Sequence, residues 1–94
     1  MIVRFVKMTF KAGKENEFLQ LFHFAEQKIR DFEGCSHLEL LRDLKNPNVF
    51  FTCSHWESEA HLEKYRSSAL FNSVWGKASA LFLQKAEAWS TQKS

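Results

Sequence analysis

Residues 45–56 read KNPNVFFTCSHW, a turn followed by a strand. The first four residues favour a turn, and the next eight are rich in β-branched and aromatic side chains. The preceding segment, residues 35–43 (CSHLELLRD), is compatible with helix or strand by composition alone. Because it is followed by turn residues and a clear strand, we predict that the two segments pair as a β-hairpin.

On the N-terminal side, the pattern changes from a strand to a helix. Residues 2–10 (IVRFVKMTF) favour a strand, and Lys11 to Gly13 turn the chain. From residue 14 to about residue 30, apolar side chains recur every three or four residues, which predicts an amphipathic helix. They are Phe18, Phe22, Ala25 and Ile29. Gly34 is available for a left-handed cap after this helix.

On the C-terminal side, two serines mark the expected helix starts. Ser58 is a good N-cap for a short helix over residues 59–66, and Ser67-Ser68 can begin a second helical piece. Residues 83–89 are expected to form a last strand. The polar tail, residues 90–94, is expected to be frayed.

The predicted order is strand, helix, strand, strand, helix, strand. This order is typical of the split βαβ, ferredoxin-like α+β fold, in which helices cover one face of a four-stranded antiparallel sheet. With 94 residues, the chain is expected to form a single domain spanning residues 1–94.

The strands are apolar on both faces. In residues 2–10, Ile2, Val6 and Met8 alternate with Val3 and Phe5. Two helices cannot cover both faces of the sheet, and a monomer rarely exposes so large an apolar patch. A second copy would cover the open face, so we predict a homodimer.

Composition excludes several partners. The net charge is only +2, and basic and acidic residues are interspersed, which argues against a nucleic-acid surface. No apolar run is long enough to cross a membrane. We see no signal-peptide pattern and expect a cytoplasmic protein, in which Cys35 and Cys53 are reduced thiols.

Nearly the whole chain resembles the antibiotic biosynthesis monooxygenase family, and the most specific residues lie in its central third. The residues that carry the resemblance are Glu33-Gly34-Cys35, Glu39, Arg42-Asp43, Asn46-Pro47, Trp56-Glu57-Ser58-Glu59-Ala60 and Ser68-Ala69-Leu70-Phe71. The resemblance implies a dimeric α+β barrel. It also implies one of several activities, because the family includes cofactor-free oxygenases of quinol-type substrates, haem-degrading enzymes and an autoinducer-processing enzyme.

Some residues depart from the family pattern. Trp75 stands where haem-degrading members carry the haem-ligating His, and Tyr65 stands where they carry a Trp. Arg4 and Phe5 occupy the region of their first-strand Asn. Leu70 replaces a His that is frequent in the family. These departures disfavour haem degradation and remove one candidate acid or base.

Cofactor-free oxygenation needs a dry pocket and a group that stabilises a developing anion. Arg4 is the candidate cation, although it could equally extend to water from the sheet edge. Tyr65 could orient a substrate oxygen or simply close the core. We expect the pocket to be lined by Phe5, Phe22, Phe71 and Trp75, although an aromatic stripe at helical spacing also fits a core.

His37 and His55 are the histidines most suited to chemistry. If the hairpin pairs symmetrically about Asn46, they lie opposite each other, and Glu39 lies opposite Cys53. Such a group could hold zinc, but a one-residue slip would destroy it. A cross-strand polar pair or a general base is the other interpretation, and we predict no metal site.

The function favoured by the sequence is a cofactor-independent monooxygenase that acts on a small aromatic or quinol-like molecule. One alternative is a non-catalytic dimeric module that binds a small apolar ligand. Another is a haem-binding or haem-degrading protein.

Overall fold

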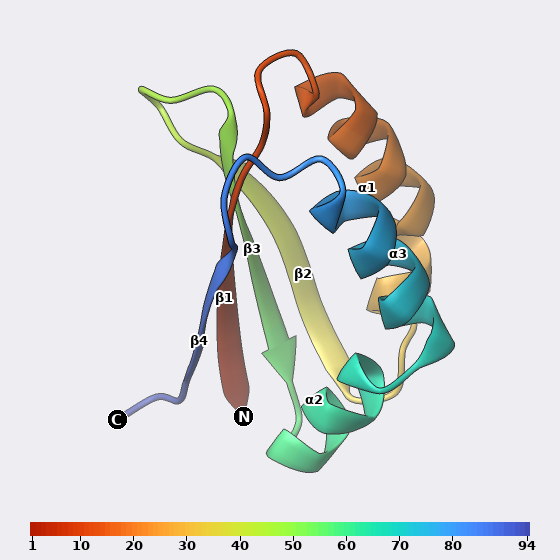
Figure 1. Cartoon of the computed structure of the whole chain (residues 1–94). Coiled ribbons are helices and arrows are strands. Elements are labelled where there is room, and N and C mark those ends of the chain that lie inside the picture. Colours follow the sequence, from red (N-terminus) through yellow and green to blue (C-terminus); the bar gives the residue numbers. More distant parts are fainter.

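A computed structural model describes all 94 residues as four strands and three helices (Figure 1). In chain order these are β1 (Ile2–Thr9), α1 (Glu15–Arg30), β2 (Cys35–Arg42), β3 (Val49–Trp56), α2 (Glu59–Arg66), α3 (Ala69–Ser79) and β4 (Glu87–Thr91). The strands form one antiparallel sheet in the order β2-β3-β1-β4. All three helices lie on the same side of the sheet (Figure 1). The predicted α+β, ferredoxin-like fold is confirmed.

The hairpin of β2 and β3 has the predicted register. His37 lies opposite His55 and Glu39 lies opposite Cys53. A bulge between Cys35 and His37 shifts the pairing near the start of β2. The turn is held by the Asp43 carboxylate, whose Oδ2 accepts hydrogen bonds from the backbone N–H groups of Lys45 (3.0 Å) and Asn46 (2.8 Å). These bonds to the charged form lower the pKa of Asp43.

The serine caps of α2 and α3 are also confirmed. Ser58 Oγ accepts a hydrogen bond from the His61 N–H at 3.2 Å, and Ser68 Oγ accepts one from the Phe71 N–H at 3.1 Å. Each cap satisfies a backbone donor that the first turn of a helix leaves free. The second cap follows the first by ten residues and begins a new helix. The region therefore forms two helices, α2 and α3, instead of one.

The turn before β2 depends on Gly34. Helix α1 ends at Arg30, and Gly34 follows the cap residue Asp31 with a φ of +89°. A Cβ on Gly34 would lie 2.5 Å from the side chain of His61 in α2. Glycine is therefore required here both by the backbone conformation and by the close approach of α2.

The last strand lies later in the sequence than predicted. β4 covers Glu87–Thr91 rather than residues 83–89, so Ser90 and Thr91 belong to the sheet and not to the tail. Arg4 Nη1 donates to Ser90 Oγ at 2.8 Å, and Thr91 Oγ1 donates to the Val3 carbonyl at 2.8 Å. These long-range bonds explain why two polar residues extend the strand.

The core lies between the sheet and the helices. Phe10, Phe18 and Phe50 form its aromatic centre, with ring centroids of Phe10 and Phe18 4.3 Å apart. A smaller cluster contains Ile2, Trp56 and Leu62. Trp56 is only 1% exposed, in agreement with its predicted structural role. None of the three helices has the length and apolar character that crossing a membrane requires.

The other side of the sheet, which we call the open face, carries no helix (Figure 1). In each strand, every second residue faces the helices, and the residues between them form the open face. The apolar ones are Val3, Phe5, Leu41, Val49, Phe51 and Trp89. Leu41 and Trp89 are 45% and 46% exposed. The sheet is thus apolar on both faces, as the alternation predicted.

Candidate functional site

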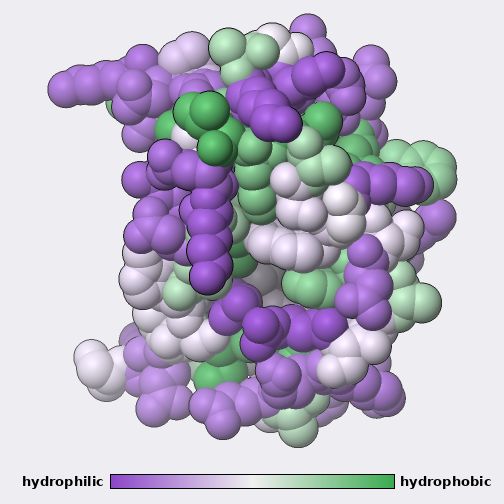
Figure 2. Space-filling model, viewed as in Figure 1, coloured by the Kyte–Doolittle hydropathy of each residue, from purple (hydrophilic) through white to green (hydrophobic).

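A cavity of about 290 Å³ lies between the sheet and the helices. Fifteen of the 19 residues around it are hydrophobic, and they come from all four strands, all three helices and the residue just before β4. Figure 2 shows apolar side chains between the two layers, with hydrophilic side chains around them. A largely apolar cavity with a few polar groups is typical of a small-molecule site.

Aromatic side chains from α2 and α3 form one wall of the cavity. Tyr65 stacks on Trp56, with ring centroids 4.8 Å apart and planes tilted by 23°. Phe71 stacks on Trp75 at 5.7 Å and meets Tyr65 edge-on at 5.3 Å. These contacts join the four rings into one continuous surface against which a flat ligand can pack.

Arg4 brings a positive charge to this apolar cavity. It lies on the face of β1 that points toward the helices, next to Ser54 of β3. Burial lowers the pKa of its guanidinium, the nearby Arg66 lowers it further, and Glu63 raises it. Even so, a guanidinium with an ordinary pKa above 12 remains charged at neutral pH. Arg4 can therefore stabilise an anion in the cavity.

Tyr65 brings a neutral hydrogen-bond donor. Burial raises the pKa of its hydroxyl to about 12, with a smaller contribution from Cys35. At neutral pH the hydroxyl thus keeps its proton and can donate it to a ligand oxygen, but it is a poor general base. No buried side-chain oxygen or nitrogen of the chain is left without a partner.

The remaining polar groups of the cavity are Thr52, Ser54 and Arg66. Ser54 Oγ accepts a hydrogen bond from Trp56 Nε1 at 3.0 Å, so this serine is used in fixing the indole. No His, Asp, Glu, Cys or Lys lines the cavity. Proton removal from a ligand therefore has no conventional protein base at hand and depends on cation stabilisation and on water.

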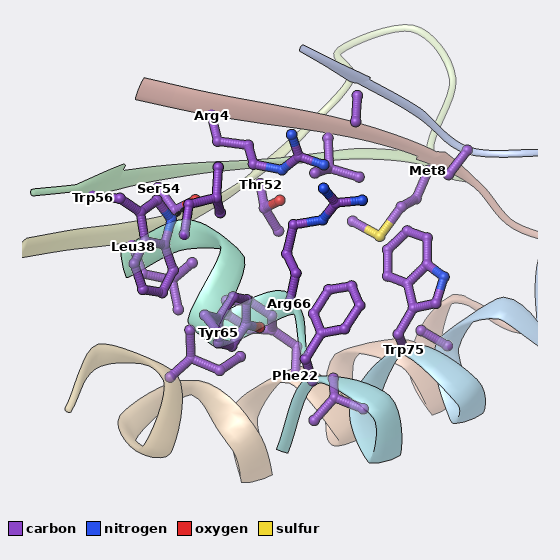
Figure 3. Close-up of a pocket in the computed structure, with 18 of the residues that line it drawn as sticks. Arg4, Met8, Phe22, Leu38, Thr52, Ser54, Trp56, Tyr65, Arg66 and Trp75 are labelled. Atoms are coloured by element: carbon purple, nitrogen blue, oxygen red, sulfur yellow. Dashed lines mark hydrogen bonds between the residues drawn. The ribbon is translucent and has the colours of Figure 1, made fainter. Parts of the chain in front are cut away.

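The structure brings together five of the eight residues singled out from the sequence. Arg4, Tyr65, Phe22, Phe71 and Trp75 all line the cavity. Figure 3 shows the side chains of Arg4, Phe22, Tyr65 and Trp75 converging on it from β1 and from the helices.

The other three residues, Phe5, His37 and His55, lie on the open face. Phe5 pairs with Cys53 and Trp89 there, so its expected place in the pocket is wrong. The reason is strand alternation, which points Phe5 away from the side that its neighbour Arg4 faces. The same alternation keeps the two histidines from acting as a general base at this cavity.

The two histidines nevertheless meet as the hairpin register predicted. Their ring centroids are 4.7 Å apart, and His37 Nε2 lies 3.4 Å from Glu39 Oε1. Cys53 is buried beside them, and burial and Glu39 raise the pKa of its thiol. No three His, Cys, Asp or Glu side chains are arranged to hold a metal ion. The group is a cross-strand polar pair on the open face.

Three polar cavity residues were not singled out from the sequence as site residues, namely Thr52, Ser54 and Arg66. Thr52 and Ser54 share the strand alternation of Phe50 and Trp56, so their direction was available once the buried face of β3 was known. Arg66 is at the end of α2, where its side chain reaches back toward β1. That direction depends on how α2 packs, and the sequence alone does not reveal it.

Comparisons with known proteins agree on the fold. Residues 1–74 match the family model described as antibiotic biosynthesis monooxygenase. A crystal structure described by the same name is 19% identical, covers 100% of this chain and 99% of its own, and superposes with a TM-score of 0.94. A conserved protein from Methanosarcina mazei is 23% identical, with 100% and 94% coverage and a TM-score of 0.93.

A third structure, from Mycobacterium tuberculosis, is 11% identical, with 99% and 94% coverage and a TM-score of 0.90. At such low identities these likenesses show the fold alone. A search of curated protein sequences gives no match.

Proposed function

Because the chain belongs to the antibiotic biosynthesis monooxygenase family, we propose that it is a cofactor-independent monooxygenase acting on a small aromatic, quinol-like substrate. The observation that carries this proposal is the aromatic-walled cavity, with Arg4 and the Tyr65 hydroxyl as its anion-stabilising groups. Family membership supports a monooxygenase in general, and the cavity supports the substrate class.

The cavity is large enough for a small ring system. An apolar cavity of roughly 150 Å³ is large enough to bind benzene. At about 290 Å³, this cavity has about twice that volume. The stacked surface of Phe71 and Trp75 would hold such a flat molecule in one orientation.

The proposed chemistry uses electrons of the substrate itself. An ionised phenol or enol is electron-rich enough to react with dioxygen directly. In an anthrone, one oxygen atom of O₂ replaces the two hydrogens of the ring CH₂ group as a carbonyl, and the other leaves as water. Because no protein base lines the cavity, the substrate would lose its proton to solvent as it binds. Arg4 would favour the resulting anion, and Tyr65 would donate a hydrogen bond to its oxygen. The apolar walls would keep water from the reactive intermediate.

Oxygen uptake with a panel of hydroquinones and anthrones tests this function. We expect uptake above the buffer rate for at least one ring system that fits the cavity. Arg4→Gln should reduce the rate about tenfold or more, because it removes the cation nearest the developing charge. The control is Arg30→Gln, since Arg30 lies on the outer surface of α1 and pairs with Glu26. An uptake rate equal to that of buffer for the whole panel would overturn the proposal.

A second candidate function is a module that binds a ligand without changing it. It is favoured by one observation, the lack of a conventional acid or base around the cavity. In that case an aromatic ligand incubated with the protein and air would be recovered unchanged by mass spectrometry. For the haem alternative, titration with haem should give no Soret shift, because none of the four histidines lines the cavity.

We also propose that the protein is a homodimer in which the open faces of two copies meet. The apolar side chains of this face, including the exposed Leu41 and Trp89, support the proposal. An apolar sheet face left in water is a liability that a second sheet removes. The dimeric barrel expected from the family resemblance has this arrangement.

A further inference from the structure

Two arginines reach the same part of the cavity from different elements. Arg4 extends from β1 and Arg66 from the end of α2. Figure 3 shows both guanidinium groups entering the gap between sheet and helices side by side. We call this part of the cavity, lined by Arg4 and Arg66, the mouth.

The mouth carries more positive than negative charge. Arg66 Nη1 is paired with Glu63 Oε1 at 2.9 Å, but Arg4 has no carboxylate within ion-pair distance. Its partner is the neutral hydroxyl of Ser90, at 2.8 Å. The repulsion from Arg66 lowers the pKa of Arg4 more than the attraction of Glu63 raises it. One positive charge thus lacks a counterpart in the protein.

We propose that the substrate bears a permanent carboxylate, which binds between Arg4 and Arg66 while its ring occupies the apolar cavity. The proposal rests on the function proposed above and names the substrate more narrowly, as an aromatic acid with an electron-rich ring. The reacting hydroxyl would be a separate group that accepts a hydrogen bond from Tyr65. Because Arg66 would share the carboxylate, Arg4 would remain available to the anion of this hydroxyl.

The geometry favours a carboxylate over a single oxygen anion. A carboxylate has two oxygens that accept several hydrogen bonds, and guanidinium groups present their donors in a planar fork. Two forks from opposite sides of the mouth suit one carboxylate. Arg4 and Arg66 are the cationic side chains of the cavity lining, so the permanent charge is best placed between them and the ring against the apolar walls.

Binding of matched ligands to the unmodified protein gives the first test. Calorimetry would compare 2-naphthoic acid with 2-naphthamide, which has the same shape and no charge. At neutral pH we expect the acid to bind about tenfold tighter or more. Added sodium chloride should reduce this preference, because it screens the charges. Equal affinities, or no measurable binding of the acid, would overturn the proposal.

Substitutions identify the groups responsible. Arg4→Gln and Arg66→Gln should each weaken binding of the acid about tenfold and leave binding of the amide unchanged. Arg30→Gln serves as the matched surface control and should alter neither affinity. Arg4→Lys keeps the positive charge and should retain part of the preference for the acid over the amide. It therefore tests the role of the charge even if Arg4→Gln fails to fold. Parallel losses of acid and amide binding in the folded Gln variants would count against the mouth as the acid site.

Measuring oxygen uptake together with ligand binding distinguishes the carboxylate site from the proposed monooxygenase activity. Preferential binding of the acid without oxygen uptake would leave the carboxylate site standing and remove the monooxygenase. Oxygen uptake with neutral quinols, together with equal binding of acid and amide, would support the monooxygenase and overturn the carboxylate site.

Discussion

Tyr65 is the only tyrosine of the chain, and it is surrounded by aromatic rings. Trp56 stacks on it, while Phe32 and Phe71 contact it edge-on. A spectroscopic titration of tyrosine therefore reports this one group. Since its hydroxyl must remain protonated to donate to a substrate, its pKa bears directly on the proposed chemistry.

Our first prediction concerns this titration. Burial raises the pKa of Tyr65 from the usual 10.0 to about 12, so tyrosinate absorbance should appear at a midpoint near 12 in the folded protein. In the unfolded chain the hydroxyl ionises from pH 10 upward. Below pH 10 the free energy of unfolding therefore keeps the full contribution of the protonated Tyr65. This contribution falls by about 1.4 kcal/mol per pH unit as the pH rises from 10 toward 12.

In Tyr65→Phe, the free energy of unfolding should fall less between pH 10 and 12 than in the unmodified protein, because no hydroxyl ionises at this position. Urea unfolding of the two proteins between pH 9 and 12 isolates the contribution of Tyr65 from that of the lysines. A midpoint near 10 in the folded protein would show that the hydroxyl is open to water.

Gly34 gives a second prediction at the level of one residue. Gly34→Ala should destabilise the protein by about 2 kcal/mol or more, because a left-handed backbone and a clash with His61 add together. Gly13→Ala is the matched control, since Gly13 has a φ of +86° but no atom within 4 Å of the added Cβ. It should cost only about 1 kcal/mol. Equal losses in urea unfolding would mean that the contact with α2 is unimportant.

The site was predictable from the sequence only in part. Arg4, Tyr65 and Trp75 were found because a charge in an apolar strand and aromatic residues on short helices stand out. Phe5 was misplaced although alternation along β1 already separated it from Arg4. Arg66 was missed because an arginine at a helix end is ordinary until the packing of α2 is known.

At the level of elements, the sequence predicted the register of the hairpin correctly but placed the last strand too early in the chain. The turn at residues 45–48 and the alternation on both sides of it fix the register of β2 and β3 locally. β4 has no such local signal. Its polar residues Ser90 and Thr91 join the sheet through bonds to β1, about 88 residues away in sequence. A pattern read along the chain cannot reveal a partner that far away.

Truncation of the C-terminus tests the role of β4. Removing residues 92–94 should leave stability unchanged, because they lie outside the strand. Removing residues 90–94 should cost about 1 to 3 kcal/mol, since it deletes two strand residues and the partner of Arg4. Urea unfolding of both truncated proteins provides the comparison. Equal stabilities would indicate that Ser90 and Thr91 contribute nothing to the sheet.

At the level of the whole molecule, the two faces of the sheet have different roles. One face meets the helices and encloses the cavity, and the other presents Phe5, Leu41, Phe51 and Trp89 to the outside. Phe51 lies between Lys7 and Leu41 in the sheet, so an acidic residue there would be tolerated within one copy.

We therefore expect Phe51→Glu to convert a dimer into a folded monomer. Sedimentation should give twice the chain mass of 11.0 kDa for the unmodified protein at micromolar concentration and a single chain mass for the variant. Two charges facing each other across a dry interface explain the effect. Phe24→Glu on α1 is the control, because Phe24 is 73% exposed on the helical layer and should leave the dimer intact. A monomeric unmodified protein would refute the dimer.

The strand order also has a consequence for synthesis of the protein. β1 precedes the other strands in the sequence but lies inside the sheet, between β3 and β4. Its second neighbour, β4, leaves the ribosome after β1, β2 and β3. Pairings this distant in sequence form slowly and late in folding. Ala88, which lines the cavity, and Ser90, which holds Arg4, are both on that strand. The nascent chain therefore cannot complete the wall of its cavity until β4 has left the ribosome.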